Sequence, residues 1–407
     1  MPNTPLTLLY LTVDYGSMPG VNNKELARIR TLQQHGLNTI PIFFLSHGKR
    51  PSPTIAELPN VQVVEVPSPK LPALLNRRYF RNYKARLYYY AGNRLLYNTM
   101  AKVLSKRAFD FAFLRYPWTT IQLRDLAGKY PCQFVFEHNG KDTEIDYSDM
   151  EVGRDYLWRQ EHRYRPAVLK NAAGHVGVTR DILDYMLSGS QVDPRRQVVI
   201  SNGIDPRTVA PRRMPSESQS LRILFVASPA PWHGVDRLLK GLALYRGDWP
   251  IEVILVGDYP TATHELARAL GLERSVQFTG RLVGRELDAV FDRCQIAVGS
   301  LALHRLRMTE GSTLKVREYL MRGIPFVLAG PDVDLTAADE ISHLVLQLPA
   351  TDEPVDMNQV AQFAKIAMAD REHGTKLRKF AEQHVTMEQK TRDLMQFLDT
   401  LRKLPRG

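Results

Sequence analysis

Short apolar runs alternate with longer amphipathic stretches along most of this chain, and this alternation constrains the fold more than any other feature. In the first half, the apolar runs cover residues 7–13, 38–45, 61–66, 109–115, 133–138 and 175–179. Helical patterns lie between them, such as residues 24–36, which end on a glycine where a helix C-cap favours one. A repeat of strand, helix and strand predicts a parallel sheet with helices on both faces.

The alternation stops near residue 200 and then starts again. Residues 206–220, with the sequence PRTVAPRRMPSESQS, contain three prolines and show no periodicity, which is typical of a connection between domains. Further apolar runs cover residues 221–228, 251–257, 275–280, 295–300 and 324–330, and a helical pattern without a strand follows from about 355 to 404. Because 407 residues exceed what one hydrophobic core usually holds, we predict two doubly wound α/β domains, at 1–200 and 221–384, joined by a linker at 201–220.

Composition excludes several classes of protein. Hydrophobic residues make up 44% and charged residues 24%, close to globular averages, which excludes a disordered, collagenous or coiled-coil chain. The net charge of +11 predicts an anionic partner. The first residues lack the basic flank and cleavage site of a signal peptide, and no apolar run approaches the ~18 residues that span a bilayer. Two cysteines, Cys132 and Cys294, favour a reducing compartment, so we expect a cytoplasmic protein.

Two glutamates, Glu310 and Glu318, are separated by seven residues, and a helix is expected to begin between them near Leu314. Three small residues precede that helix: Gly311, Ser312 and Thr313. One of the two hydroxyl side chains can cap the helix, and the free N–H groups of its N-terminus form an anion site. Doubly wound sheets bind ligands at the carboxyl ends of their strands, so we predict this site in a cleft between the domains. Carboxylates on both sides of a phosphate site suit a nucleoside diphosphate sugar, which carries hydroxyls at both ends.

This segment resembles the Glu-x7-Glu signature of retaining glycosyltransferases with the GT-B fold, particularly those of glycosyltransferase family 4. Four segments resemble motifs of that family: VISNGID at 199–205, WHGVDRLL at 232–239, SVQFTG at 275–280 and LKVREYLMRGIPFV at 314–327. The resemblance covers the second domain well and the first domain only at scattered points. It implies a GT-B fold, with two doubly wound Rossmann-like domains, an interdomain cleft, and a last helix, at about 385–407, that packs back on the first domain.

The resemblance also implies roles for individual residues. Glu310 would contact the donor sugar and Glu318 the ribose hydroxyls, with the backbone from Gly311 to Leu314 near the sugar and the diphosphate. His138, which ends an apolar run, resembles by position a histidine that family members place near the donor sugar. No metal and no cofactor is implied, because the nucleotide sugar, UDP- or GDP-linked, is a substrate. The other positions assigned to the donor by this reasoning are Gly16, Gly20, His233, Gly234, Ser312, Thr313, Lys315 and Arg281.

One loop departs from the family pattern. Where the family often places an arginine and a lysine after the first strand of the second domain, this chain has ASPAPWHG, with Ser228 and His233 at those positions. A serine and a neutral histidine supply less positive charge to a diphosphate leaving group. We expect Lys315, in the first turn of the helix, to supply the missing charge. The second choices lie in the loop upstream: His304, Arg305 and Arg307.

The first domain offers fewer candidates. Gly16 and Gly20 punctuate the loop 14–25 and would let the backbone approach a phosphate or an acceptor, although an ordinary tight connection is the alternative. The loop is not a P-loop, because the Gly-Lys-Ser/Thr ending is absent. Glu137 and Asp142, near His138, are candidates for acceptor contact or for a base.

Two other chemistries use paired carboxylates. Asp332 and Asp334 match the Asp-x-Asp motif through which other glycosyltransferases bind a metal, but they follow the last predicted strand, and we treat the match as chance. Glycosidases also use two carboxylates, yet they need no diphosphate site.

Positive charge is concentrated in the first domain. Residues 66–109 contain ten Lys or Arg, interleaved tyrosines and no Asp or Glu, which accounts for nearly all of the net charge. Such a segment can lie on an anionic membrane, contact an acidic acceptor or form a merely solvated face, and no nucleic-acid module accompanies it. We expect an anionic acceptor, or peripheral contact with the inner face of the plasma membrane, at Arg77, Arg78, Arg81 and Lys84.

These observations predict a retaining, metal-independent glycosyltransferase that moves a hexose-type sugar from a nucleotide sugar to a glycan or lipid-linked acceptor, in polysaccharide or glycolipid biosynthesis. Two alternatives stay open. One is another GT-B enzyme, either an inverting transferase or a nucleotide-sugar epimerase. The other is a non-catalytic protein that keeps the fold and binds a polyanion or a membrane.

Overall fold

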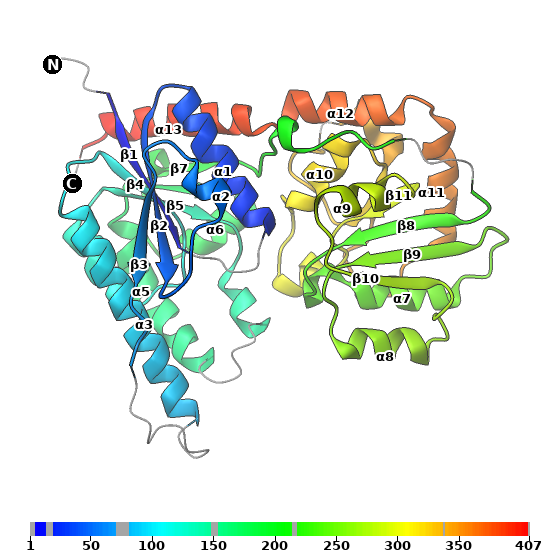
Figure 1. The fold of residues 1–407 in the computed structure, drawn as a ribbon, viewed down its shortest axis with the longest axis horizontal. Helices are drawn as coiled ribbons and strands as arrows, with labels where there is room; N and C mark the ends of the chain where they lie inside the picture. The colour runs from blue at the N-terminus through cyan, green and yellow to red at the C-terminus, as the bar shows by residue number, and fades with distance from the viewer. Residues whose placement is uncertain are drawn as a thin grey trace. The chain divides into compact units, whose positions relative to one another are not determined.

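The computed structural model describes residues 5–13, 19–70, 81–147, 154–213, 218–336 and 338–405. The chain forms two compact units (Figure 1). Unit 1 comprises residues 1–200 and 390–407, and unit 2 comprises residues 201–389.

Unit 1 is built on a seven-stranded parallel sheet with the strand order β3-β2-β1-β4-β5-β6-β7. The strands are β1 (Thr7–Val13), β2 (Asn38–Ser46), β3 (Gln62–Val66), β4 (Phe111–Arg115), β5 (Phe134–His138), β6 (Gly174–Gly177) and β7 (Gln197–Val199). The helices are α1 (Pro19–Gln34), α2 (Pro53–Ala56), α3 (Arg81–Leu104), α4 (Ile121–Lys129), α5 (Arg154–Lys170), α6 (Arg180–Leu187) and, after unit 2 in the chain, α13 (Met387–Lys403).

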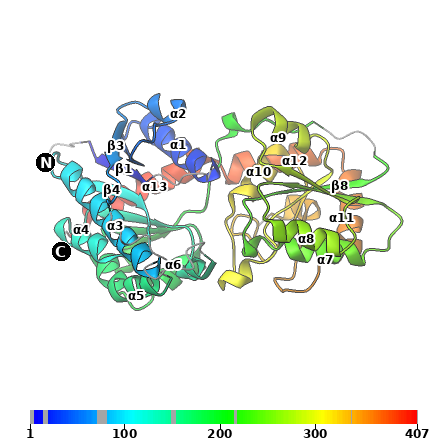
Figure 2. The ribbon, with the colours of Figure 1, turned by 60° about the horizontal axis from the view of Figure 1, so that its bottom comes forward.

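Helices cover both faces of this sheet, because alternate residues of a strand point to opposite sides. Leu8 and Tyr10 of β1 lie in one buried cluster with residues of α1 and α13, whereas Leu9 and Leu11 lie in another with residues of α3, α4, α5 and α6. Figures 1 and 2 show α1 and α13 on one side of the sheet and α3 and α5 on the other. Unit 1 therefore has a doubly wound core on each face.

Helices α4 and α6 each begin with a side-chain cap. Thr120 precedes α4 and accepts the N–H of Leu123 at 3.2 Å. Thr179 precedes α6 and accepts the N–H of Ile182 at 3.1 Å. Each hydroxyl satisfies one of the N–H groups that a helix start leaves unpaired.

Unit 2 is built on a six-stranded parallel sheet with the order β10-β9-β8-β11-β12-β13. The strands are β8 (Leu221–Val226), β9 (Ile251–Val256), β10 (Val276–Gly280), β11 (Ile296–Val298), β12 (Phe326–Ala329) and β13 (Val345–Leu348). The helices are α7 (Val235–Leu244), α8 (Thr261–Ala269), α9 (Gly284–Phe291), α10 (Leu314–Arg322), α11 (Met357–Ala369) and α12 (His373–His384). Buried residues of both sheet faces belong to one continuous hydrophobic cluster.

The prediction of two doubly wound, Rossmann-like domains is confirmed, with two strands missed. These are β7, which is three residues long and half-buried throughout, and β13, where Gln347 interrupts the apolar run. Both lie at a sheet edge, where a strand needs less apolar sequence.

The described residues 201–213 of the segment expected as a linker pack onto the rest of unit 2. Val209 is buried in the hydrophobic cluster of that unit. Arg212 is buried as well and donates hydrogen bonds to the carbonyl oxygens of Gly323 (3.2 Å) and Cys294 (2.7 Å). Residues 206–213 are therefore largely irregular backbone that is anchored to unit 2.

Within the described residues, no helix combines the length and the apolar character needed to cross a membrane.

Candidate functional site

The strand order of unit 2 changes direction between β8 and β11. The loops that leave such a pair of strands run to opposite sides, and ligands bind where they separate. The loop after β8 is fastened to the loop after β11 by two backbone hydrogen bonds. Leu301 N–H donates to the carbonyl of His233, and Ala302 N–H donates to the carbonyl of Trp232, both at 3.1 Å. This fastening brings side chains of the two loops together at the switch point.

A glycine makes this close approach possible. Gly234, directly before α7, has φ 68° and ψ 32°, in the left-handed region. A Cβ at this position would lie 2.9 Å from the Cβ of Leu301 and 3.1 Å from that of Ala302. Only glycine accepts both the backbone conformation and the contact without strain.

Three side chains meet at the switch point, and we call them the Lys315 cluster: Lys315, His233 and Ser300. The Nζ of Lys315 lies 3.2 Å from Nδ1 of His233, and the Oγ of Ser300 lies 3.1 Å from the same nitrogen. A protonated lysine can only donate, so Nδ1 accepts and a neutral His233 carries its proton on Nε2. The cluster therefore offers an ammonium and an imidazole N–H.

Burial controls the charge of the cluster. Burial lowers the pKa of Lys315 to about 7. Burial, together with the charge of Lys315, holds the pKa of His233 well below its usual value, so the ring is neutral at neutral pH. The Nζ of Lys315 also lies 5.0 Å from the centre of the Phe225 ring, and among the described residues no carboxylate pairs with it. An anion bound beside Lys315 would raise its pKa and so keep the side chain protonated.

Helix α10 begins beside the cluster without a side-chain cap from the residues predicted to supply one. Thr313 occupies the N-cap position, but its hydroxyl makes no capping bond and is buried with no hydrogen-bond partner among the described residues. The Oγ of Ser312 instead accepts the N–H of Asn202 at 2.8 Å. The predicted cap is therefore wrong, because a residue distant in the sequence binds Ser312. A bound anion can satisfy the N–H groups of such a helix start.

A buried arginine fixes the orientation of α10. Arg317 is fully buried and donates from Nε to the carbonyl of Asn202 at 3.1 Å. Its two terminal nitrogens bind Asp332 and Asp334, and Asp334 also accepts the Ser201 hydroxyl at 2.8 Å. The two aspartates of the Asp-x-Asp match thus bind a guanidinium. Sequence reasoning missed Arg317, since no local pattern connects positions so far apart in the chain.

Glu318 lies one turn inside α10, as the sequence predicts. It is partly exposed, and its Oε1 accepts a hydrogen bond from Nε of Arg322 at 2.8 Å. Arg322 also donates to Asp288 at 2.7 Å, so the arginine is held between two carboxylates. Arg281 is exposed directly after β10. The assignment of both residues to the donor stays a prediction.

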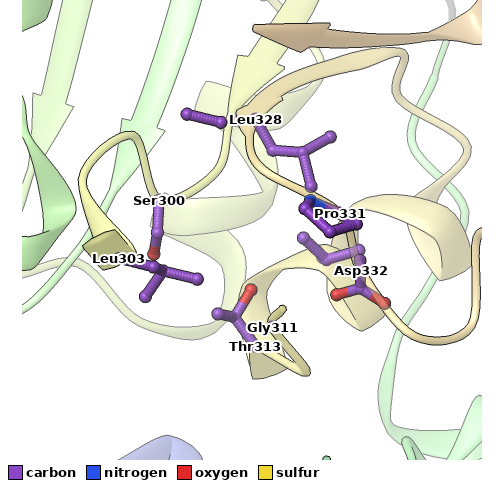
Figure 3. A pocket seen from close by; sticks show the side chains of 9 residues that line it. Ser300, Leu303, Gly311, Thr313, Leu328, Pro331 and Asp332 are labelled. Atoms are coloured by element: carbon purple, nitrogen blue, oxygen red, sulfur yellow. The ribbon is translucent and has the colours of Figure 1, made fainter. Parts of the chain in front are cut away.

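A small, partly open pocket lies next to the start of α10 (Figure 3). It is lined by Ser300, Leu303, Gly311, Thr313, Val316, Leu328, Ala329, Pro331 and Asp332. Gly311 forms its lower edge, with its N–H bound to the carbonyl of Pro331 at 2.9 Å. Glu310 directly precedes Gly311, so the donor contact predicted for Glu310 would lie beside this pocket.

The second-choice cations are paired with carboxylates or exposed. Arg305 donates to both carboxylate oxygens of Asp236 at 2.9 Å and to Asp352 at 2.7 Å. His304 lies 3.3 Å from Asp352. Arg307 is exposed. The charge of Arg305 is therefore largely offset, which leaves Lys315 as the best-placed cation.

In unit 1, Glu137 is held in a buried ionic cluster. Its two oxygens lie 2.9 Å from Nζ of Lys24 and 2.6 Å from Arg28. Burial raises the pKa of Glu137, but Arg28 and Lys24 outweigh this, so the pKa lies well below its usual range. A carboxylate this tightly paired does not serve as a base, which argues against that role for Glu137.

Asp142 is similarly engaged. It accepts hydrogen bonds from Arg165 and from the Tyr185 hydroxyl, each at 2.7 Å. His138 is buried at the end of β5, as the sequence predicts, and its Nε2 lies 3.1 Å from Nδ1 of His175. Among the three polar residues predicted near this strand end, His138 is the one without an ionic partner in the described structure.

Several predicted positions fall outside the described residues: Gly16, Arg77 and Arg78. Gly20 is the second residue of α1, which begins earlier than the sequence pattern suggests. Arg81 and Lys84 belong to the first turn of α3, and their side chains are outside the description.

Comparison with known proteins agrees with this architecture. Residues 220–348 match the family model described as "Glycosyl transferases group 1". No curated protein matches the chain. A glycosyltransferase from Rickettsia africae ESF-5 is 15% identical with a TM-score of 0.66, covering 99% of this chain and 100% of its own.

Two further structures are similar over nearly their whole length. HepE of Anabaena, in complex with UDP and glucose, is 15% identical with a TM-score of 0.62, covering 97% of this chain and 99% of its own. WaaG, a glycosyltransferase involved in lipopolysaccharide biosynthesis, is 15% identical with a TM-score of 0.65, covering 95% and 99%. The fold is GT-B, and the match to a glycosyl transferase family model over residues 220–348 together with this fold supports a glycosyltransferase.

Proposed function

We propose that this chain is a retaining, metal-independent glycosyltransferase that transfers a hexose-type sugar from a UDP- or GDP-linked donor to a glycan or lipid-linked acceptor. The observation that carries the proposal is the Lys315 cluster, which places a covered ammonium and an imidazole N–H at the switch point of a glycosyltransferase group 1 domain. Ligands of doubly wound domains bind at this position.

The cluster suits a diphosphate for electrostatic reasons. Lys315 supplies a point charge, the Nε2 of His233 supplies a donor, and the start of α10 adds backbone N–H groups and a partial positive charge. Fixed donors of this kind stabilise the charge that develops on a leaving diphosphate. They take the place of the arginine and lysine that the loop after β8 lacks.

The two glutamates suit the two ends of the donor. A carboxylate accepts hydrogen bonds from the two hydroxyls of a ribose, and we assign this role to Glu318. Its Oε1 is held by Arg322 at 2.8 Å, which fixes the side chain in one orientation. We assign Glu310, at the pocket beside α10, and His138 of unit 1 to the sugar.

In the proposed reaction, the acceptor hydroxyl approaches the anomeric carbon on the face of the leaving diphosphate. The bond from the anomeric carbon to the phosphate oxygen breaks, a bond to the acceptor oxygen forms, and a diphosphate oxygen takes the hydroxyl proton. The configuration at the anomeric carbon is retained. Lys315 and His233 stabilise the negative charge left on the diphosphate.

We place an anionic acceptor, or the anionic membrane that presents it, at the basic segment of unit 1. Within α3, Tyr88 and Tyr90 have exposed fractions of 51% and 37%, and Arg86 and Arg94 are exposed as well. Exposed tyrosines next to arginines suit the headgroup region of an anionic bilayer. Such a membrane contact would be peripheral, at the cytoplasmic face, and would serve polysaccharide or glycolipid biosynthesis.

The donor assignment is tested by thermal shift and calorimetry with a panel that includes UDP-glucose, UDP-galactose and GDP-mannose. Glu318→Ala should raise the KM for the donor that binds by about tenfold to a hundredfold, the range for a hydrogen bond to a charged group. Glu286→Ala, which removes an exposed glutamate of α9, is the matched control. An unchanged donor KM in Glu318→Ala would refute the ribose assignment.

The stereochemistry and the acceptor side have separate tests. The anomeric configuration of the product distinguishes retention from inversion, and turnover without an acceptor indicates an epimerase. Neutralising Arg77, Arg78, Arg81 and Lys84 together should weaken sedimentation with anionic vesicles and leave donor affinity unchanged. Vesicle binding without affinity for any nucleotide sugar would favour the non-catalytic alternative.

A further inference from the structure

Two buried histidines in unit 1 form a chain of hydrogen bonds that ends on a backbone carbonyl. His138 ends β5, and His175 is the second residue of the neighbouring strand β6. The Nε2 of His138 lies 3.1 Å from Nδ1 of His175, and the Nε2 of His175 lies 3.0 Å from the carbonyl oxygen of Leu169 in α5. The exposed fractions of the two histidines are 1% and 0%, so water does not reach either ring freely.

Both rings are neutral at physiological pH. Burial lowers the pKa of His175 to about 4. Burial, reinforced by the neighbouring His175, holds the pKa of His138 well below its usual value. Each ring therefore carries one proton, on one of its two nitrogens.

The carbonyl of Leu169 decides where those protons are. A carbonyl oxygen only accepts, so the proton of His175 is on Nε2 and its Nδ1 presents a lone pair. The Nε2 of His138 must then donate to that lone pair, which leaves Nδ1 of His138 without a proton. The Leu169 carbonyl thus fixes the tautomer of His138 indirectly, through its hydrogen bond to His175.

The lone pair on Nδ1 of His138 has no partner among the described residues, although the atom is buried. The nearest aromatic neighbour, Tyr116, has its ring centre 4.7 Å from that of His138. The hydroxyl of Tyr116 is bound to Thr119 and lies 3.3 Å from Glu161, so it is not directed to His138. Leaving a buried acceptor unpaired costs stability, and a hydroxyl of a bound ligand can supply the missing donor.

We propose that His175 is a positioning residue: together with the Leu169 carbonyl it holds His138 in the Nε2–H tautomer, so that Nδ1 accepts a hydrogen bond from a hydroxyl of the sugar substrate. The proposal rests on the proposed function, since it assumes that His138 meets the sugar. In the opposite tautomer the ring would present an N–H to that hydroxyl, which would then have to turn its proton elsewhere. His175 thereby acts on the substrate only through His138.

The tautomer can be measured in the free, full-length protein labelled with 15N-histidine. Long-range 1H–15N spectra should show a pyridine-like Nδ1 and a protonated Nε2 for His138, assigned by comparison with His138→Gln. In His175→Phe the acceptor is lost and His138 should populate the Nδ1–H form. In His175→Asn the side-chain carbonyl keeps an acceptor near the Nδ1 position, and the Nε2–H form should persist. Thermal unfolding of each variant shows whether it folds.

Kinetics with the nucleotide sugar selected from the panel completes the test. His175→Phe should lower kcat/KM about tenfold, the size of one hydrogen bond, and His175→Asn should recover most of the loss. A wild-type His138 in the Nδ1–H form, or a tautomer unchanged by His175→Phe, overturns the proposal. Equal activity of both variants and the wild type overturns it as well. If no nucleotide sugar is turned over, the proposed function fails, and the spectra of the free protein still decide the tautomer.

Discussion

Two largely buried lysines, one in each unit, differ in whether a carboxylate contacts them. Lys24 of unit 1 is 3% exposed and donates to Glu137 at 2.9 Å and to Asn139 at 2.8 Å. Lys315 of unit 2 contacts the neutral ring of His233 and the face of Phe225. Burial lowers the pKa of Lys24 to about 8, against the opposing effect of Glu137, and lowers that of Lys315 to about 7.

The difference separates a structural charge from one kept for a ligand. Lys24 already contacts a carboxylate inside unit 1, and removing that carboxylate would leave its charge buried without a partner. Around Lys315 the opposite charge is missing from the described structure, and a covered cation of this kind is typical of a binding site. The following predictions test this contrast, from the largest expected effect to the smallest.

Removing the carboxylate from the unit 1 cluster should be severe. Glu137→Ala leaves Lys24 and Arg28 buried without their partner, which costs about 3–5 kcal/mol of unfolding free energy. Thermal unfolding measures the loss, and Glu57→Ala, at an exposed position, is the control. A variant as stable as the control would show that the cluster is not structural.

Removing the lysine of unit 2 should affect binding and not stability. Lys315→Met should weaken nucleotide-sugar binding by about tenfold to a hundredfold, because one charge-assisted hydrogen bond to a phosphate is lost. The melting temperature should stay the same or rise, since an unpaired covered charge is removed. Isothermal calorimetry measures the affinity, with the exposed Lys240→Met as the control. A large loss of stability with unchanged affinity would reverse the contrast.

Donor binding should also depend on pH. The pKa of Lys315 is about 7 in the free protein, and a bound diphosphate raises it, so binding takes up a proton as the pH rises above 7. If the protonated form alone binds, affinity should be about fivefold lower at pH 8 than at pH 7 and fall further at higher pH. The same titration with Lys315→Met should be flat. A flat profile in the wild type would mean that another group carries the charge.

The smallest effect compares two helix starts. Thr179 caps α6 with its hydroxyl, so Thr179→Val should cost about 1 kcal/mol. Thr313 occupies the same position on α10 without capping it, so Thr313→Val should leave the free energy of unfolding nearly unchanged. Equal losses of stability in urea unfolding would show that Thr313 does cap its helix.

Periodicity accounts for most of the fold. Apolar runs and glycine stops are local signals, and they locate eleven of the strands, α10 and the position of Glu318 within it. Ser228 and His233 stand where an arginine and a lysine are often found, and this difference suggests Lys315 as the source of positive charge. The Nζ of Lys315 lies 3.2 Å from Nδ1 of His233. Short edge strands such as β7 carry too little apolar sequence to stand out.

Contacts between distant positions were not predictable in this way. Arg317 binds Asn202, Asp332 and Asp334, and nothing in the sequence around Arg317 indicates these partners. The backbone N–H of Asn202 donates to the Ser312 hydroxyl, and this contact also joins positions far apart in the chain. His175 lies in an apolar run, and only the neighbouring strand reveals its partner.

The place of α13 in unit 1 has a consequence for biosynthesis. Leu394, Phe397 and Leu398 are buried in the same cluster as Leu8 of β1, although the whole of unit 2 is encoded between them. On the ribosome, unit 2 has all its residues before unit 1 does. The part of this sheet face that α13 covers, beside α1, therefore stays exposed during translation of residues 201–389, and a nascent chain in that state exposes apolar surface that a chaperone can bind.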